Sequence, residues 1–149
     1  MKLSENFDLG EFTASDTAAR KGIDNTLPRE LLPAALATAE MMERIRAVLG
    51  GKAIIITSGY RSPALNTAIG STHTSDHPKA LAVDFRCPEF GTPYEVAKHL
   101  AGKIDGLGVG QLIHEFGSWI HCSTRMPARA PNRVITISAR GTELGIQRA

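Results

Sequence analysis

The order of apolar and polar positions predicts one long helix in the first third of the chain. Between residues 29 and 49, apolar side chains recur at intervals of three and four, which is the pattern of an amphipathic helix. Gly50 and Gly51 are suited to end it. Pro33 fits such a helix only in its first turn. The periodic positions are Leu32, Leu36, Ala39, Met42, Ile45 and Leu49.

Both ends of the chain carry weaker patterns. Residues 1–14 predict an extended lead-in, and residues 139–149 a short C-terminal tail. Between the lead-in and the long helix, Ser15 or Asp16 is suited to cap a short helix that Gly22 ends.

Short apolar runs rich in β-branched residues predict the strands. Residues 53–57 and 80–85 indicate buried strands, and residues 133–138 indicate a last one. The segment 110–124 contains two β-type runs that meet at Phe116 to Ser118, which predicts a hairpin with its turn around the glycine.

A long polar segment separates the first two strands. It covers residues 58–78 and predicts only a turn or two of helix, around residues 63–69. Polar segments of this length inside a compact domain are usually functional. After the second strand, residues 92–102 predict a helix with Thr92 as its cap and Pro93 at its first position.

These elements predict an α+β fold with a largely antiparallel sheet, because helices come early and a mixed set of strands comes late. The chain has 149 residues and shows no internal repeat, low-complexity segment or long linker. A single domain over residues 1–149 follows, and that length suffices for a core without disulfides. Cys87 and Cys122 are too few for a disulfide framework, and either is compatible with a small buried hydrophobic side chain.

Charge and composition are those of an ordinary globular protein. The chain is 42% hydrophobic and 21% charged, with a net charge of +2, so we expect no nucleic-acid partner. From Arg125 to the end there are five arginines and one glutamate. This segment predicts a solvated basic tail, with contact to an anionic surface as the alternative.

Targeting signals are absent from the pattern. The first residues, MKLSENFDLGEF, carry charges where a signal peptide has its apolar core, and no run reaches the length of a membrane span. We therefore expect synthesis in the cytoplasm without a signal peptide.

Three polar residues in predicted strands suggest a metal site. His77 stands at the entrance to the strand that contains Asp84, and His121 lies in the second arm of the hairpin. Each residue alone is more often structural, and an isolated buried charge costs several kcal/mol or more. Together, two imidazoles and one carboxylate are the ligand set of a catalytic zinc site. Pro78 favours an extended backbone at His77.

The sequence around these residues resembles a known family. SDHPKALAVDF resembles the S-x-H-x-x-G-x-A-x-D signature of the zinc D-alanyl-D-alanine carboxypeptidase family, which shares its fold with the hedgehog signalling domain. TSGYRSPALN resembles that family's S-G-Y-R-S block, and WIHCS its W-x-H block. The likeness runs from about Phe7 to Ile137 and extends to the small cell-wall peptidases common in phages and prophages.

The resemblance implies one zinc ion with His77, Asp84 and His121 as its ligands. It also implies a hedgehog/DD-peptidase-like fold with helices packed on one side of the sheet. The implied activity is hydrolysis of peptidoglycan stem peptides or cross-links, either as a carboxypeptidase or as an endopeptidase of the endolysin type.

Other site residues follow from the same resemblance. Arg61 is expected to stabilise the oxyanion or hold a substrate carboxylate, with a loop-ordering ion pair as the alternative. Ser75 is expected beside the metal, orienting a ligand or the substrate. Trp119 is expected to flank the cleft, with sheet packing as the alternative, and Tyr60 and Asn66 to shape the loop.

The catalytic base has two candidates, and strand parity separates them, because successive strand residues face opposite sides. With a two-residue turn, His114 lies across from His121 and faces the metal. With a three-residue loop, Glu115 pairs with Trp119 and shares the face of His121. We favour Glu115, because the family's base is a glutamate in this hairpin, although some relatives have it where Ser118 stands here.

The chain departs from the family signature at one position. Ala80 occupies the place of the motif glycine, at a cost on the order of 1 kcal/mol if that position needs positive φ. His73 near the motif and His99 on a predicted helix are expected to lie outside the ligand set.

Three functions remain open from the sequence. The first is a zinc peptidase that acts on peptidoglycan in the cell wall or periplasm. The second is a virion component that uses the same fold for assembly with other virion proteins or for wall binding. The third is a metal-stabilised binding module without catalysis. A competent base and Arg61 favour the first.

Overall fold

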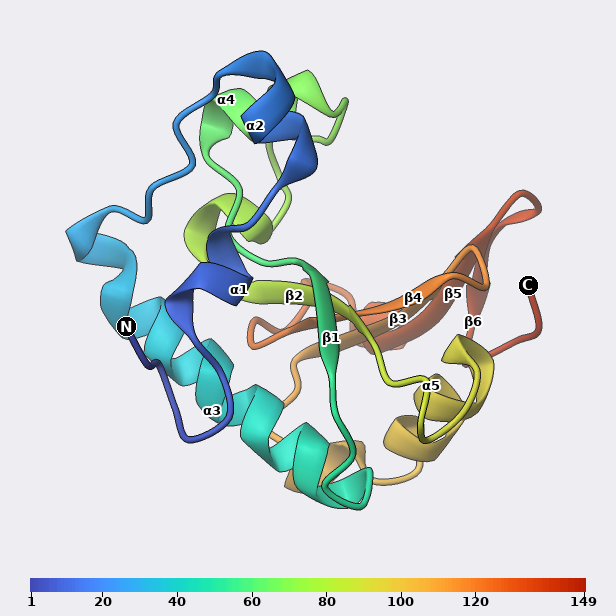
Figure 1. Cartoon of the computed structure of the whole chain (residues 1–149). Coiled ribbons are helices and arrows are strands. Elements are labelled where there is room, and N and C mark those ends of the chain that lie inside the picture. The colour runs from blue at the N-terminus through green and yellow to red at the C-terminus, as the bar shows by residue number, and fades with distance from the viewer.

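The computed structural model describes residues 1–149 and is built on one sheet of six strands in the order β1-β2-β4-β3-β5-β6 (Figure 1). All neighbouring strands are antiparallel except β3 and β5, which are parallel. The predicted α+β class with a largely antiparallel sheet is confirmed. The strands are β1 (Ile55–Ser58), β2 (Ala82–Arg86), β3 (Gln111–Glu115), β4 (Trp119–Ser123), β5 (Val134–Ser138) and β6 (Gly141–Leu144).

The helices begin and end close to the signals in the sequence. Ser15 accepts a hydrogen bond from the Ala18 amide at the start of α2, and Gly22 ends that helix with φ 65°. Pro33 lies in the first turn of α3, as predicted. The α-helices are α1 (Leu9–Thr13), α2 (Asp16–Lys21), α3 (Leu32–Val48), α4 (Pro63–Ala68) and α5 (Pro93–Ala101). The 3-10 helices are η1 (Arg29–Leu31), η2 (His77–Lys79), η3 (Ile104–Gly106) and η4 (Ala130–Arg133).

The core lies between one face of the sheet and helices α3 and α5 (Figure 1). Alternate strand residues supply the sheet side of this core, because side chains in a strand point to opposite faces. Full burial of each large apolar side chain contributes about 1.5–3 kcal/mol. The opposite face is thereby left to polar side chains. Core members include Val83, Phe85, Leu112, Ile120 and Cys122 from the strands, and Met42, Ile45, Val96 and Leu100 from the helices.

The turn of the β3–β4 hairpin has three residues. Glu115 pairs with Trp119, so Phe116 to Ser118 form the loop. Phe116 and Gly117 both have positive φ, at 53° and 65°. Of the two loop lengths considered for this hairpin, the structure therefore has the longer one.

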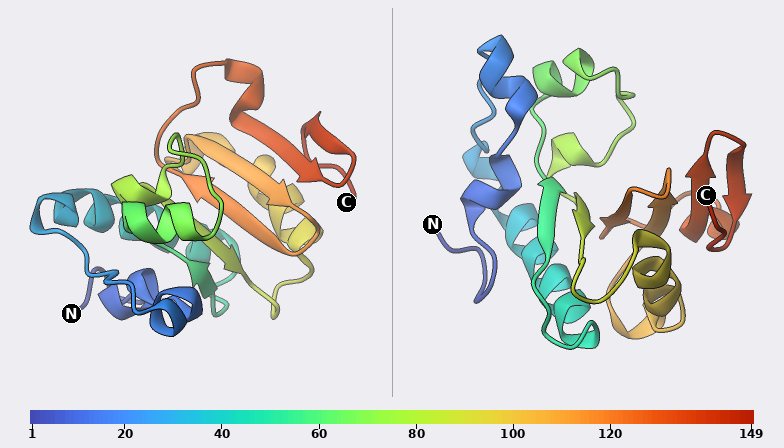
Figure 2. Two further views of the ribbon diagram at one scale, coloured as in Figure 1. Left: turned by 90° about the horizontal axis from the view of Figure 1, so that it is seen from above. Right: turned by 45° about the vertical axis from the view of Figure 1, so that its right-hand side comes forward.

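Both termini are more regular than the sequence indicates. The lead-in contains α1, whose start Asp8 caps by accepting a hydrogen bond from Gly10. The predicted tail contains β6, followed by the buried Ile146. Figure 2 shows the N-terminal helices at the β1 side of the sheet and β5 and β6 at the other side. Short elements of this kind escape periodicity because they span too few residues to show a period.

The basic C-terminal segment is not a solvated tail as a whole. Arg125 pairs with Asp76, and Arg133 pairs with Asp105 and donates to the carbonyl of Val109. The prediction is wrong for these two arginines, because each has an acidic partner far away in the sequence.

Ala80 has the positive φ that its place in the motif suggested. It ends η2 with φ 58° and is buried, and the Thr38 hydroxyl of α3 donates to its carbonyl at 2.7 Å. The left-handed backbone costs alanine on the order of 1 kcal/mol relative to glycine. The bond from Thr38 holds this strained residue against the long helix.

Cys87 and Cys122 are both free and buried, without a disulfide. No helix in the structure combines the length and the apolar character that a bilayer crossing requires.

Candidate metal centre

The polar face of the sheet is set by the register of its central strands. Asp84 on β2 lies opposite His121 on β4, and His121 lies opposite Ile113 on β3. Since residues paired across antiparallel strands share a face, these three side chains lie on the side away from α3 and α5. Every second residue along each strand belongs to the same face, which adds Glu115 and Trp119.

The long polar segment brings His77 to this face. His77 is not at a strand entrance but begins the 3-10 helix η2, so the extended backbone predicted from Pro78 is wrong. Its Nδ1–H donates to the Gly59 carbonyl at 2.7 Å, and its own carbonyl accepts from the Arg61 amide at 3.3 Å. These two bonds connect η2 to the residues that follow β1.

The three candidate ligands converge. Asp84 Oδ1 lies 2.8 Å from His121 Nδ1 and 3.3 Å from His77 Nε2. One donor atom from each residue lies within 4.8 Å of the others, and all three residues are almost fully buried.

This donor set fits a divalent metal ion. Because His77 donates its Nδ1 proton to Gly59, the Nε2 lone pair of the neutral ring faces Asp84 Oδ1. Two acceptors at that distance repel unless a cation lies between them. Two imidazoles and a carboxylate match the protein ligands of zinc, and the carbonyl of Gly59 acts as the outer partner that orients one ring.

Electrostatics favour the charged carboxylate at this point. Burial opposes ionisation of Asp84, but the lowering effects, led by its hydrogen bond with His121, outweigh burial and hold the pKa of Asp84 well below its usual range. Burial also opposes charge on His121, yet its hydrogen bond with Asp84 raises the pKa of the imidazole. The pair therefore holds a negative oxygen ready for a cation.

Glu115 lies beside the ligands, whereas His114 does not. Glu115 Oε1 is 3.9 Å from His121 Nδ1. Burial raises the pKa of Glu115, and the charge of Asp84 adds to this, against the opposing effects of His121 and Arg61. His114 faces the core, where its Nδ1–H donates to the Gln147 carbonyl at 2.9 Å and its ring packs against Tyr94. The side chain of His114 thus belongs to the other face of the sheet.

Arg61 carries an unpaired donor at the same site. It is half-buried, and its Nε is buried without a hydrogen-bond partner in the protein. Burial lowers the pKa of Arg61, and the charges of Asp84 and Glu115 oppose that shift. The ion pair considered as its alternative role is not formed, so its donors are available to a ligand.

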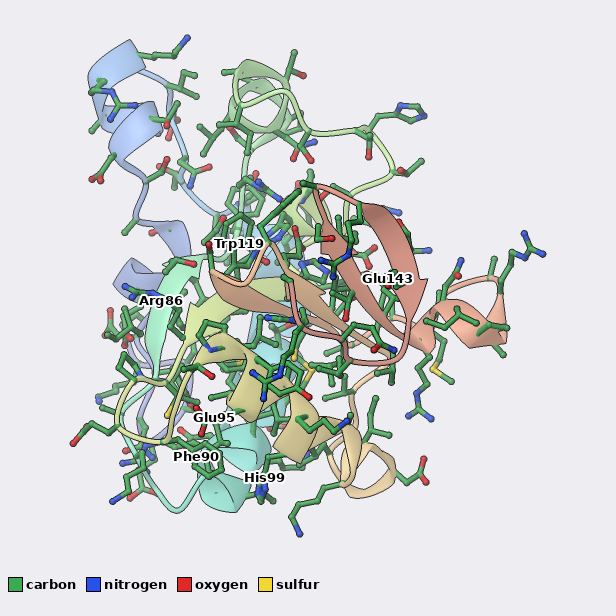
Figure 3. The ribbon with its side chains drawn as sticks, turned by 90° about the vertical axis from the view of Figure 1, so that its right-hand side faces the viewer. Arg86, Phe90, Glu95, His99, Trp119 and Glu143 are labelled. Atoms are coloured by element: carbon green, nitrogen blue, oxygen red, sulfur yellow. The ribbon has the colours of Figure 1, made fainter.

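The other residues singled out in the sequence fall into two groups. Ser75 accepts a hydrogen bond from the His77 amide at 3.3 Å, and Asn66 donates to the Thr72 carbonyl, so both order the polar loop. His73 is exposed. His99 donates to the Val48 carbonyl and packs on Phe90, and Figure 3 shows these two residues together, far from Trp119.

The candidate ligands line a hollow of about 380 Å³ whose wall is mostly polar. Sequence reasoning missed several of its residues. Gln111 could have been found from strand parity, since it continues the face of Glu115. Asp76 and Arg125 had no such signal, because only the fold joins them. The wall includes Arg61, Ser75, Asp76, Gln111, Glu115, Trp119 and Arg125.

Gly59 cannot take a side chain without movement of the backbone. A Cβ there would lie 2.5 Å from the Phe12 carbonyl oxygen and 2.7 Å from the Phe12 Cα. We expect Gly59→Ala to lower the free energy of unfolding by about 2 kcal/mol, because overpacking must displace α1 or the Gly59 carbonyl. Loss of the bond to His77 should weaken zinc binding about tenfold or more. Urea unfolding and competition with a chelator measure the two effects.

Gly106→Ala is the matched control for this substitution. Gly106 is exposed, and a Cβ there would meet nothing within 4 Å. The Gly106→Ala substitution should change neither the free energy of unfolding nor the zinc affinity appreciably. Normal zinc affinity in a folded Gly59→Ala protein would contradict the role of the Gly59 carbonyl.

The family model described as Peptidase M15 matches residues 5–123, which include all three candidate ligands and Glu115. No curated protein matches the chain.

Proposed function

Because the chain belongs to the Peptidase M15 family, we propose that it is a zinc-dependent peptidase that hydrolyses peptide bonds in peptidoglycan stem peptides or cross-links. One observation carries the proposal. His77, Asp84 and His121 converge in one hollow that Glu115 and Arg61 also line. A ligand set, a candidate base and a free cation within one hollow are the parts that metal-assisted peptide hydrolysis requires.

The proposed metal site has three protein ligands, and the bound ion would supply the Lewis-acid chemistry. His77, Asp84 and His121 would hold the zinc ion. A bound zinc ion polarises the scissile carbonyl and lowers the pKa of water to about 7. The hydrogen bond from His77 to Gly59 keeps that ring in the tautomer whose Nε2 is free for a ligand bond.

Glu115 moves the proton. A carboxylate oxygen of Glu115 accepts a proton from the attacking water and later delivers it to the leaving amine nitrogen. Its place on the face of His121, with Oε1 3.9 Å from Nδ1, supports this assignment. His114 is set aside as the base because its ring is buried on the core face.

Arg61 binds negative charge. Its unpaired Nε and its guanidinium charge, close enough to be affected by Asp84 and Glu115, suit it to the developing oxyanion or to a terminal carboxylate of the substrate. The mostly polar wall of the hollow supports a polar peptide as substrate, since most of its lining residues can form hydrogen bonds.

Incubation of purified peptidoglycan fragments with the zinc-loaded protein tests the function, with mass spectrometry as the readout. Release of D-alanine would identify a carboxypeptidase, and split stem peptides or cross-links an endopeptidase. A Glu115→Ala protein should leave the fragments intact. Fragments left intact by the unaltered protein with zinc bound would contradict the proposal and favour a binding or virion-assembly role.

A further inference from the structure

The hollow extends along β4. Trp119, His121 and Ser123 follow one another on the same face of that strand, and Arg125 comes two residues later. Trp119 and Ser123 are separated by about 13 Å in an extended strand. Figure 3 shows Trp119 at the hairpin end. The hollow therefore has an aromatic end at Trp119, the candidate metal ligands in the middle and a cation at the Arg125 end.

Hydrogen bonds fix the Nε and the backbone amide of Arg125. Its Nε donates to Asp76 Oδ1 at 2.6 Å, and its amide donates to the Ser123 hydroxyl at 3.1 Å. The same hydroxyl donates to the other oxygen of Asp76 at 2.8 Å. Gly110 packs against the backbone of Arg125 so closely that a Cβ would collide with it. Asp76 is buried, so its carboxylate is shielded from water, whereas the guanidinium that it holds is about half exposed.

The outer edge of the same guanidinium remains free. Only its Nε takes part in a hydrogen bond within the protein, and the side chain is 48% exposed while it lines the hollow. A guanidinium whose Nε is fixed and whose two Nη groups are free presents parallel donors to a planar anion such as a carboxylate. Pre-organisation by Asp76 reduces the entropy lost when such a ligand binds.

The two arginines of the hollow have different surroundings. Arg61 interacts with the charges of Asp84 and Glu115, at the candidate reacting centre. Arg125 is paired with Asp76 at the far end of the hollow. A substrate that meets both would present the developing oxyanion or a terminal carboxylate to Arg61, and a separate negative group, further along the chain, to Arg125.

We propose that Arg125 binds an internal free carboxylate of the peptide substrate and makes the protein specific for acidic over amidated peptides. This inference rests on the proposed function, because the bound peptide is the proposed substrate. The carboxylate lies along β4 on the Ser123 side of His121. Asp76 acts as the positioning residue that directs the guanidinium into the hollow.

The test compares two peptides that differ in one group. The first is L-Ala-γ-D-Glu-L-Lys-D-Ala-D-Ala, and the second carries D-isoglutamine in place of D-glutamate, so that the internal carboxylate becomes an amide. Isothermal titration calorimetry measures their dissociation constants with zinc-loaded Glu115→Ala protein, which should bind without cleavage. The acidic peptide is expected to bind about tenfold more tightly.

When Arg125→Ala is added to the Glu115→Ala protein, the ratio of the two dissociation constants should fall to about one. Adding Arg129→Ala should leave the ratio unchanged, since Arg129 is an exposed arginine of the same segment that does not line the hollow. Loss of the ion pair between Arg125 and Asp76 would weaken the binding of both peptides equally. The ratio of the two dissociation constants therefore reports only on recognition of the internal carboxylate. If Arg125→Ala does not fold, Arg125→Lys keeps the charge without the fork and should at least halve the ratio.

A ratio near one in the starting protein, or a ratio that Arg125 substitutions leave unchanged, would overturn the inference, as would failure of both peptides to bind. Cleavage is measured separately with the unaltered protein. Discrimination in binding without cleavage would uphold the role of Arg125 and overturn the peptidase proposal. Cleavage without discrimination between the two peptides would uphold the peptidase proposal and overturn the role of Arg125.

Discussion

Glu115→Gln is expected to lower kcat for peptide hydrolysis about 10³-fold while the protein still binds one zinc ion. Glutamine has the size of glutamate but cannot accept the proton of the attacking water, and general base catalysis contributes roughly 10²- to 10⁴-fold. Glu115 approaches His121 but is not among the three converging ligands, so zinc binding should survive. Steady-state kinetics measures kcat, and elemental mass spectrometry measures the zinc bound per protein.

The matched control is Glu89→Gln, which removes the same charge from an exposed position outside the hollow. Its kcat should equal that of the unaltered protein. Activity within tenfold of normal in Glu115→Gln, with normal zinc content, would show that another group moves the proton. His114 would not be the replacement, because its side chain lies on the core face.

Removal of zinc is expected to lower the melting temperature by about 10 °C. Three buried ligands converge on one point, and without a cation the lone pair of His77 faces the carboxylate of Asp84. Free zinc at a thousand times its dissociation constant stabilises the folded state by about 4 kcal/mol. For a chain of this size each kcal/mol shifts the melting temperature by about 2–4 °C. Thermal scans with zinc and with a strong chelator measure the difference.

His121→Ala provides the control for this experiment. It removes one ligand, so its melting temperature should respond neither to zinc nor to the chelator. Equal melting temperatures of the unaltered protein in zinc and in chelator would argue against a contribution of the metal to stability.

Local signals in the sequence predicted elements that depend on few neighbours. The Thr92 cap and Pro93 at the first position of α5 are as expected, because capping is decided within one turn. Strand parity predicted the shared face of Glu115 and His121 once the loop length was chosen. The meeting of His77, Asp84 and His121 was predictable only as a set, through the spacing of the family motif.

Long-range pairing accounts for what sequence reasoning missed. Arg125 and Asp76 are 49 residues apart, and no periodicity connects them. The backbone of His77 was misjudged for a related reason. The rule for residues before proline favours an extended chain, but the bonds of η2 to Gly59 and Arg61 hold His77 in a 3-10 turn. Tertiary contacts override the local preference there.

The separation of the ligands along the chain has a kinetic consequence. Asp84 and His121 are 37 residues apart and meet only after β2 has paired with β4 in the middle of the sheet. Closing that loop costs conformational entropy before any ligand bond repays it. We therefore expect capture of a metal ion to be a late step in folding, after the central strands have aligned. An interaction formed that late slows unfolding and leaves the folding rate almost unchanged, so a bound metal ion is expected to lengthen the lifetime of the native state.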